Sequence, residues 1–455
     1  MSDVTVSYKG VDIATMDASG TKTLQTQGKY CEGDISIAYV KPSGGGSVVQ
    51  KDVNFYDYDG SIVASYSAAD FANLAQLPAN PAHIGLISQG WNWTLVDAQT
   101  YVAAYGNLDV GQMYVTDDGK TRIYIRLEQG RLAPYFGLAV NGTATIDWGD
   151  GSTASIVAGD STSTVINTQH IYSEPGDYVI TIAINGSAAF LGTSIGSQIL
   201  WKNSQTTNEN RCYQNSIQRV ELGIGIDIGD YAFKACYSLT SITLPSGVTS
   251  IGGSAFDSCF SLTNITLPSG VTSIGGSAFD SCFSLTNITL PSGVTSISYY
   301  AFSGCSSLTN ITLPSGVTSI SYYAFSGCSS LTNITLPSGV TSIDNNTFRN
   351  CYSLSSITLP NGVKSIGNYA FYDCFSLTNI TLPSGVTSIS NNAFYYCEGL
   401  GEIHFKPSTP PTVSASNAFT GIPTDCIIYV PTGKLTAYTS KSNYPSSSTY
   451  TYREE

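Results

Sequence analysis

The chain has 455 residues and a formal net charge of -13, which has the wrong sign for a phosphate backbone and excludes nucleic acid as a partner. Only 11% of the residues are charged, whereas 44 are glycine and 30 are tyrosine. This length and composition predict a mainly β, multidomain protein rich in turns. No apolar run is long enough for membrane insertion, and the first six residues lack a secretion signal, so we expect a chain that folds in the cytoplasm.

The N-terminal part, residues 1–42, is predicted to be a β segment that attaches the chain to a larger assembly. Its residues 20–35 read GTKTLQTQGKYCEGDI and resemble the start of prophage tail proteins of Gram-positive gut bacteria. That resemblance implies other tail proteins as partners of the N-terminus. Residues 43–50 are predicted to be a flexible linker, because they open with a Ser-Gly-Gly-Gly-Ser run.

Two β-rich modules are expected next. Residues 51–120 are predicted to form a small α+β module, because residues 53–60 (VNFYDYDG) and the later Gly90-Trp91 resemble a Listeria–Bacteroides repeat. Residues 121–205 contain Trp148-Gly149-Asp150-Gly151, then His170-Ile171-Tyr172 and a Pro-Gly-x-Tyr run. This pattern resembles the polycystic-kidney-disease (PKD) type β-sandwich, which implies a spacer in which His170 packs as a structural residue.

The second half of the chain is a repeat array. Cysteines recur every 23 residues, from Cys236 to Cys397, and between them runs the pattern Leu-x-x-Ile-x-Leu-Pro-x-Gly-Val-x-x-Ile, followed by Ala-Phe. A unit this short cannot bury its own apolar face, so stacked units must share one core. We therefore predict a solenoid over residues 206–405, with short strands and a tight turn in each coil. The pattern resembles the BspA-like (treponemal-type) leucine-rich repeat family.

The end of the chain, residues 406–455, is predicted to be a cap followed by a tail. Pro410-Pro411 and Ile427-Ile428-Tyr429-Val430 are similar to the C-terminal cap of the same family. Residues 444–455 look exposed.

The cysteine ladder is predicted to consist of buried free thiols. Neighbouring rungs of a parallel sheet lie about 4.8 Å apart and their side chains run parallel, which leaves the Cβ atoms too far apart for a disulfide. The total of 11 cysteines is odd, which argues against a fully oxidised framework and suits a reducing compartment.

We predict no enzymatic activity, no metal and no cofactor. Gly192-Thr193-Ser194-Ile195-Gly196 has the spacing of a nucleophile elbow, but the one later histidine, His404, stands at the far end of the array. Gly119-Lys120-Thr121 lacks the upstream glycine of a phosphate loop, and the acidic turns at 57–60 and 147–151 lack the distal glutamate of a calcium loop. A glycan-degrading enzyme with paired carboxylates within residues 46–210 is the weaker alternative.

The coils differ from one another at few positions. The three residues after the second isoleucine change from Gly252-Gly253-Ser254 to Ser298-Tyr299-Tyr300 and Asp344-Asn345-Asn346, and a second variable patch flanks each cysteine. Tyr, Ser, Asn and Gly are the residues that binding loops use, although exposed positions of a solenoid also drift freely. We predict a ligand-binding surface made of Tyr299, Tyr300, Tyr322, Tyr323, Asn345, Asn346, Tyr369, Tyr372, Tyr395 and Tyr396.

These features favour a non-enzymatic receptor-binding protein. The first hypothesis is a phage or prophage tail fibre, located in the virion tail, whose solenoid recognises a bacterial surface glycan or protein. A surface poor in charge but rich in hydroxyls, amides and tyrosine rings suits a neutral glycan. The alternative is a secreted or cell-surface BspA-like adhesin for host cells or matrix. Fibre proteins of this kind are often homo-oligomers, but no coiled-coil heptads specify a trimer here.

Overall fold

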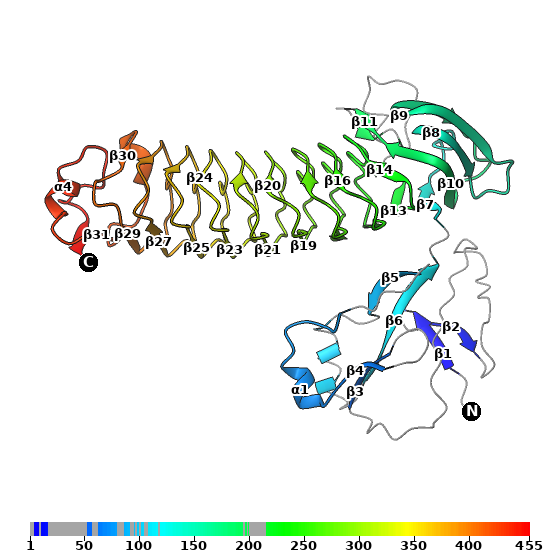
Figure 1. Cartoon of the computed structure of the whole chain (residues 1–455), viewed down its shortest axis with the longest axis horizontal. Coiled ribbons are helices and arrows are strands. Elements are labelled where there is room, and N and C mark those ends of the chain that lie inside the picture. The colour runs from blue at the N-terminus through cyan, green and yellow to red at the C-terminus, as the bar shows by residue number, and fades with distance from the viewer. Residues whose placement is uncertain are drawn as a thin grey trace. The chain divides into compact units, whose positions relative to one another are not determined.

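The computed structural model of the chain describes residues 4–8, 11–16, 52–56, 62–79, 86–91, 95, 98–99, 102–103, 108–116, 119–193, 196–197, 199 and 215–455. The chain divides into two compact units, Met1–Asp118 and Gly119–Glu455 (Figure 1). The predicted linker 43–50 and the tail-like segment 20–35 lie outside the described residues. Within the described ranges, no helix has both the length and the apolar character needed to cross a membrane.

The described residues of the first unit form two small sheets. Its first two strands, β1 (Val4–Tyr8) and β2 (Val11–Met16), pair antiparallel. The second sheet has the order β4-β3-β6-β5, in which β3 and β6 are parallel and the outer pairs are antiparallel. Its elements are β3 (Val53–Tyr56), β4 (Ile62–Tyr66), α1 (Ala68–Ala72), β5 (Leu86–Trp91) and β6 (Leu108–Thr116). Phe55 and Phe71 are fully buried between this sheet and α1, with ring centroids 5.8 Å apart.

The second unit begins with a module of long antiparallel strands. They are β7 (Thr121–Leu127), β8 (Tyr135–Asp147), β9 (Ser155–Gln169) and β10 (Gly176–Phe190), followed by the short pair β11 (Gly192–Thr193) and β12 (Gly196–Ser197). β10 pairs with both β7 and β8, and β8 pairs with β9. Trp148 and Phe136 are buried against each other edge to face, which gives this module its own aromatic centre.

The module is hydrogen-bonded directly to the first coil of the repeat array. β13 (Ile217–Glu221) pairs antiparallel with β7, and β14 (Ile226–Ile228) pairs parallel with β10. The ring of Phe190 at the end of β10 then meets Phe233 of the first coil at 5.8 Å. One continuous core therefore runs from the module into the coils, and the module covers the sheet edge that the first coil leaves open. Residues 201–214, around the predicted boundary at 205, lie outside the described part of the chain.

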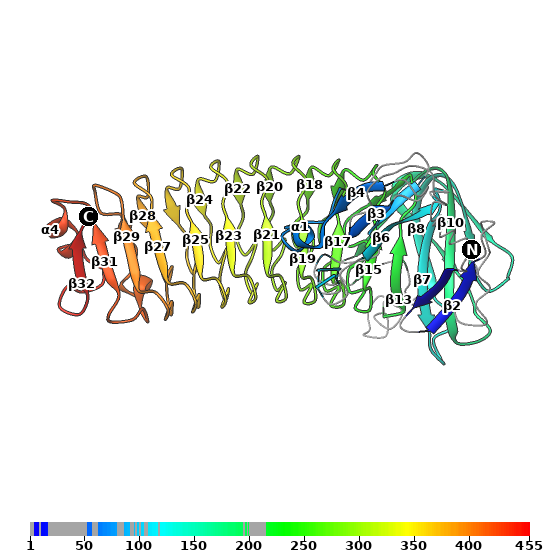
Figure 2. The same cartoon turned by 90° about the horizontal axis from the view of Figure 1, so that it is seen from below.

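Each coil contributes one strand to each of two parallel columns (Figures 1 and 2). The first column is β15 (Ser241–Thr243), β17 (Asn264–Thr266), β19 (Asn287–Thr289), β21 (Asn310–Thr312), β23 (Asn333–Thr335), β25 (Ser356–Thr358) and β27 (Asn379–Leu382). The second column is β16 (Ser250–Ile251), β18 (Ser273–Ile274), β20 (Ser296–Ile297), β22 (Ser319–Ile320), β24 (Ser342–Ile343), β26 (Ser365–Ile366) and β28 (Ser388–Ile389). Paired residues hold the same place in the repeat, as in Asn264 beside Asn287. The mainly β fold and the repeat solenoid predicted from the sequence are confirmed.

Identical side chains stack inside the coils. The buried phenylalanines form one column from Phe233 to Phe419, in which successive ring centroids lie 5.3–5.7 Å apart. The cysteine column lies beside it. From Cys259 to Cys397, each thiol donates to the carbonyl oxygen of the phenylalanine 26 residues earlier, as in Cys305 Sγ to Phe279 O at 3.2 Å. The eight stacked cysteines are fully buried, so they pack as small apolar residues.

The C-terminal cap continues both columns of strands. Its elements are β29 (Glu402–Phe405), β30 (Thr412–Val413), the short 3-10 helix η2 (Ser416–Phe419), β31 (Ile427–Val430), α4 (Leu435–Thr439) and β32 (Thr451–Glu454). Most of residues 444–455 are exposed, as expected, but the segment is tied to the cap rather than being a free tail. β32 pairs with β31, and Tyr444 and Tyr452 pack against the core because their hydroxyls reach backbone carbonyls, at 2.8 Å in each case.

Candidate binding surface

The variable residues of each coil occupy a special backbone position. The last of the three residues after the second strand is left-handed in every coil, including Tyr300 (φ 54°), Tyr323 (φ 59°) and Asn346 (φ 59°). This region is uncommon for residues with a large side chain. The turn is held by bonds between coils, since the Tyr323 backbone N–H donates to the Asn345 carbonyl at 3.0 Å. A constant backbone therefore carries side chains that differ from coil to coil.

Four predicted site residues form one aromatic group, the upstream tyrosine cluster, which consists of Tyr299, Tyr300, Tyr322 and Tyr323. The rings of Tyr299 and Tyr322 stack at 5.6 Å, and those of Tyr300 and Tyr323 stack at 4.5 Å. Between the two stacks, Tyr300 meets Tyr322 edge to face at 5.8 Å. Tyr299 is 48% exposed and Tyr322 is 44% exposed, so this cluster presents ring surface to solvent.

A glycine of the preceding coil makes room for this cluster. A Cβ atom on Gly276 would lie 2.2 Å from the ring of Tyr299, so the ring rests directly over the glycine backbone. Tyr299 consequently lies between the Gly276 backbone and the stacked ring of Tyr322, and the rest of its surface is exposed. Its ring is held in place before any ligand arrives, which lowers the entropic cost of binding.

A second group, the downstream tyrosine cluster, contains Tyr369, Tyr372, Tyr395 and Tyr396. Tyr372 and Tyr395 stack at 5.2 Å with an interplanar angle of 1°, and Tyr369 lies 5.6 Å from Tyr372. Tyr395 meets Tyr396 at 4.4 Å, and Tyr396 is 42% exposed. The guanidinium of Arg349 lies over the Tyr372 ring at 5.1 Å, which adds a cation to the group.

The two predicted asparagines lie between the tyrosine clusters and differ in environment. Asn345 is exposed, and its Oδ1 accepts hydrogen bonds from the backbone N–H of Asn368 (2.7 Å) and from the Asn368 side chain (3.2 Å). Asn346 is only 6% exposed, and its Oδ1 has no hydrogen-bond partner among the described residues. Asn345 is thus tied to the scaffold, whereas Asn346 keeps an unused acceptor.

The list of predicted site residues omitted a third set of exposed rings. The residue after the cysteine is aromatic in several coils, where stacked neighbours lie 4.7–5.2 Å apart. The coils between carry serine at this position, which is visible in the sequence as Cys-Phe against Cys-Ser. The exposed members of this set are Phe260, Phe283, Tyr352 and Phe375, with exposures of 37–44%.

The outward face of the first strand column is a regular polar ladder. Asn and Thr of the repeated Asn-Ile-Thr run are exposed, while the isoleucine between them is buried. In each such coil the asparagine side chain donates to the hydroxyl of the preceding threonine, as in Asn333 to Thr332 at 3.1 Å. The amides are therefore engaged within the strand face.

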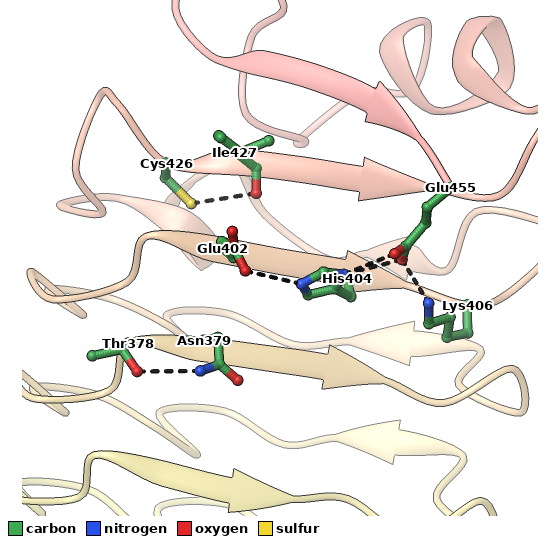
Figure 3. A network of polar contacts seen from close by, with 8 residues as sticks. All are labelled: Thr378, Asn379, Glu402, His404, Lys406, Cys426, Ile427 and Glu455. Carbon is green, nitrogen blue, oxygen red and sulfur yellow. Dashed lines mark hydrogen bonds and ion pairs between the residues drawn. The ribbon is translucent and has the colours of Figure 1, made fainter.

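The histidines that the structure describes take part in structural networks. His170 Nε2 lies 2.7 Å from Asp150 Oδ2, and its ring stacks on Trp148 at 4.6 Å. His404 lies between Glu402 and Glu455 in the cap and stacks on Tyr429 at 4.5 Å (Figure 3). His83 lies outside the described residues.

The segments with the spacing of a nucleophile elbow, a phosphate loop or a calcium loop do not form such sites where the structure describes them. Gly192-Thr193 and Gly196-Ser197 pair antiparallel, which differs from the strand-turn-helix of a nucleophile elbow, and residues 194–195 between them lie outside the description. Thr121 Oγ1 accepts the backbone N–H of Gly223 at 2.8 Å. Residues 57–60 lie outside the description, and in the part of the chain that is described no three His, Cys, Asp or Glu side chains meet as a metal site would require.

The stacked strands, the internal phenylalanine and cysteine columns and the 23-residue register define a leucine-rich-repeat solenoid. Residues 226–352 and 318–434 match the family described as "BspA type Leucine rich repeat region", with 6 copies. The repeat part of the chain therefore belongs to the BspA-type leucine-rich repeat family, as its sequence pattern predicted. The resemblances to a PKD-type sandwich and to prophage tail proteins stay predictions.

Several solved structures resemble this chain. A leucine-rich repeat protein of T. pallidum is 33% identical, with 35% of this chain and 78% of that one covered and a TM-score of 0.33. A leucine-rich cell surface protein of Faecalibacterium prausnitzii is 31% identical over 43% of this chain and 62% of that one, with a TM-score of 0.33. Because these TM-scores are low, the family assignment rests on the match of the repeat itself. The search of curated proteins gave no match.

Proposed function

We propose that this chain is a non-enzymatic receptor-binding protein whose solenoid recognises a ligand on a cell surface. The observation that supports the proposal is the contrast, within each coil, between constant buried side chains and variable exposed ones. Apolar side chains repeat almost without change inside, whereas the outward residues at one corner change to tyrosine, asparagine and arginine. Binding loops use tyrosine rings that are already ordered, because these rings contribute a large contact area at a low cost in conformational entropy. The polar residues beside them provide adaptable hydrogen bonds.

The ligand that these side chains suit best is a bacterial surface glycan or a protein rich in uncharged groups. Both tyrosine clusters offer ring faces and edges for stacking, and asparagine and tyrosine supply donors and acceptors. Charged residues are sparse on the coils, which gives an ionic partner few groups to pair with.

Two kinds of protein could present this binding surface: a tail fibre and a cell-surface adhesin. In the tail fibre, which belongs to a phage or prophage, the N-terminal segment docks with other tail proteins and the solenoid is the distal part. The resemblance of residues 20–35 to the start of prophage tail proteins supports the tail fibre. In the second, the chain is an adhesin at the bacterial surface or secreted from the cell. BspA-type repeat proteins are generally found there, which supports the adhesin.

A cell-labelling experiment tests the proposal and separates the two kinds of protein. The full chain, fluorescently labelled, is incubated with a panel of intact gut bacteria and with mammalian epithelial cells, in the presence and absence of free polysaccharide. Labelling of a narrow set of bacteria supports the tail fibre, and labelling confined to epithelial cells or matrix supports the adhesin. If the chain labels no cell, receptor binding is the wrong function.

A further inference from the structure

The middle one of the three variable residues holds the same outward place in every coil. In five consecutive coils it is Tyr299, Tyr322, Asn345, Asn368 and Asn391. We call these side chains the axial strip, because each follows the second strand of its coil and these strands are stacked along the solenoid (Figure 2). All of them are exposed or partly exposed, so a ligand can reach every member of the strip.

Contacts between coils hold the strip side chains in place. The ring of Tyr322 stacks on that of Tyr299 at 5.6 Å. Asn345 Oδ1 accepts the backbone N–H of Asn368 at 2.7 Å, and Asn368 Oδ1 in turn accepts the backbone N–H of Asn391 at 3.1 Å. Tyrosine edges with their hydroxyls therefore form the first part of the strip and side-chain amides form the second, in fixed and repeating positions.

The strip is long in one direction only, that of the solenoid axis. Its five members are separated by four coil-to-coil steps of about 4.8 Å, which gives a length of roughly 19 Å. Gly253 and Gly276 occupy this place in the two coils before Tyr299, so the strip begins at the first tyrosine. A ligand that crosses the axis meets the strip in one or two coils, whereas a ligand parallel to the axis meets all five members.

The spacing of the strip distinguishes between two kinds of extended ligand. An extended peptide turns alternate side chains to one face, about 6.6 Å apart, and so loses register with the coils within a few steps. An extended polysaccharide instead presents one ring per residue, and the length of one residue is close to one coil spacing. Its hydroxyls can bond to the amides and tyrosine hydroxyls, while its C–H groups contact the ring edges.

The side chains of the strip are all uncharged, which favours an uncharged partner. We propose that the axial strip binds an extended, uncharged polysaccharide that lies parallel to the solenoid axis, with about one sugar residue per coil. This inference rests on the proposed receptor-binding function, and it adds the form and the direction of the ligand.

The test uses the full chain and a size-separated glycan. The probe is the glycan released from the surface of the cells that the unchanged chain labels, partly hydrolysed and separated from single sugars up to long chains, as a competitor of labelling. An interrupted variant carries Asn345→Gly and Asn368→Gly, the residue found at 253 and 276. A control carries Asn310→Ser and Asn333→Ser, the residue found at 356, and so loses two exposed asparagines from the first strand column instead.

We expect competition to strengthen with chain length until the glycan spans the strip, at about five sugar residues, and then to level off. Long chains should compete roughly tenfold or more weakly for the interrupted variant, because contacts on either side of the gap no longer act together, and equally well for the control. Both variants should unfold cooperatively on heating. The length series needs only the unchanged chain, so it decides the matter even if the interrupted variant does not fold.

Three results would overturn the axial strip and leave receptor binding in place. They are single sugars that compete as strongly as long chains, equal competition for a folded interrupted variant, and no competition by any released glycan with a chain that labels cells. A chain that labels no cell would overturn both proposals.

Discussion

At the scale of single residues, each coil separates side chains that build the core from side chains that meet solvent. Phe302 and Cys305 are fully buried, while Tyr299 in the same coil is nearly half exposed. The left-handed position of Tyr300 is compatible with Ser277 and Asn346 in other coils. Side chains at this corner are therefore exchangeable without a change of backbone, which is the property that a variable binding surface needs.

The stacked cysteines should be chemically inert in the folded chain. Burial raises the pKa of the Cys305 thiol far above its usual range, and the thiolate is the form that reacts with alkylating agents. We expect the eight cysteines from Cys236 to Cys397 to resist iodoacetamide at pH 8 and to react after denaturation in urea. Intact-mass spectrometry counts the cysteines that are alkylated in the folded chain and in the denatured chain. Alkylation of any stacked cysteine at the rate of a free thiol would contradict the packing described here.

Asp280 should make stability depend on pH. Burial, reinforced by the neighbouring Asp257 carboxylate, raises the pKa of Asp280 to about 6. Because the folded chain holds this proton more tightly than the unfolded chain does, the contribution of Asp280 to stability is lost as the pH rises through about 6. We expect Asp280→Asn to raise the free energy of unfolding at pH 7.5 by about 1 kcal/mol, after allowance for partial exposure, and to have a smaller effect at pH 5.

Urea unfolding at the two pH values measures this difference. Asp227→Asn is the matched control, since Asp227 is an exposed aspartate on β14 and its replacement removes the same charge. A stabilisation that is equal for both variants, or equal at both pH values, would show that net charge rather than burial of Asp280 is responsible.

At the scale of the elements, the repeat made most of the solenoid predictable. The 23-residue spacing places Ile265 and Ile274 in register with their copies, and period-two burial follows from the Asn-Ile-Thr run. The pairing of β10 with β14 was not predictable, because it joins a module and a coil of different pattern. The packing of Tyr444 and Tyr452 against the core was not predicted, because it depends on contacts between residues distant in sequence.

The sequence predicted the tyrosine clusters of the candidate site but not the different environments of its two asparagines. Variation between coils identified the two tyrosine clusters, since exposed positions are free to change where core positions are not. It did not separate Asn345, which is bonded to Asn368, from Asn346, which has an unused acceptor. That distinction depends on side-chain direction at a left-handed residue, which spacing in the sequence does not specify.

The last strand, β32, should depend on a small polar network in the cap (Figure 3). Partial burial acts to raise the pKa of Glu455, but hydrogen bonds from Lys406 (2.7 Å) and His404 (3.1 Å) outweigh it and lower the pKa. The stabilisation is therefore present above the ordinary carboxyl pKa and is lost as the pH falls through the lowered one. We expect Lys406→Ala to cost about 1 kcal/mol and to speed hydrogen exchange in β32 at neutral pH.

Exchange of the Tyr452 and Arg453 amides, followed by mass spectrometry, measures the effect. Lys441→Ala is the control, because Lys441 is an exposed lysine of the same cap. If both variants leave the exchange of β32 unchanged, the network does not hold the strand.

At the scale of the whole solenoid, the coils should behave as interchangeable units. Residues 285–307 and 308–330 are identical in sequence, so deletion of the second copy keeps every remaining coil in register. Since stability in such arrays is a sum of coil and interface terms, we expect a folded, somewhat less stable chain with a smaller denaturant m-value. Removal of residues 308–319 alone shifts the register and should unfold the neighbouring coils. Circular dichroism with urea unfolding compares the two, and equal stability of both deletions would argue against a register-dependent core.

The central claim is that ligand binding resides in the variable tyrosine surface, and one flow-cytometry comparison tests it most directly. The first variant carries Tyr299→Gly, Tyr300→Ser, Tyr322→Gly and Tyr323→Ser, the residues found at 276–277. The matched variant carries Phe260→Ser and Phe283→Ser, the residues found at 306 and 329. We expect the tyrosine variant to lose labelling of the cells that the unchanged chain binds, with its thermal unfolding still cooperative, and the phenylalanine variant to retain it. Full labelling by a folded tyrosine variant would contradict the account.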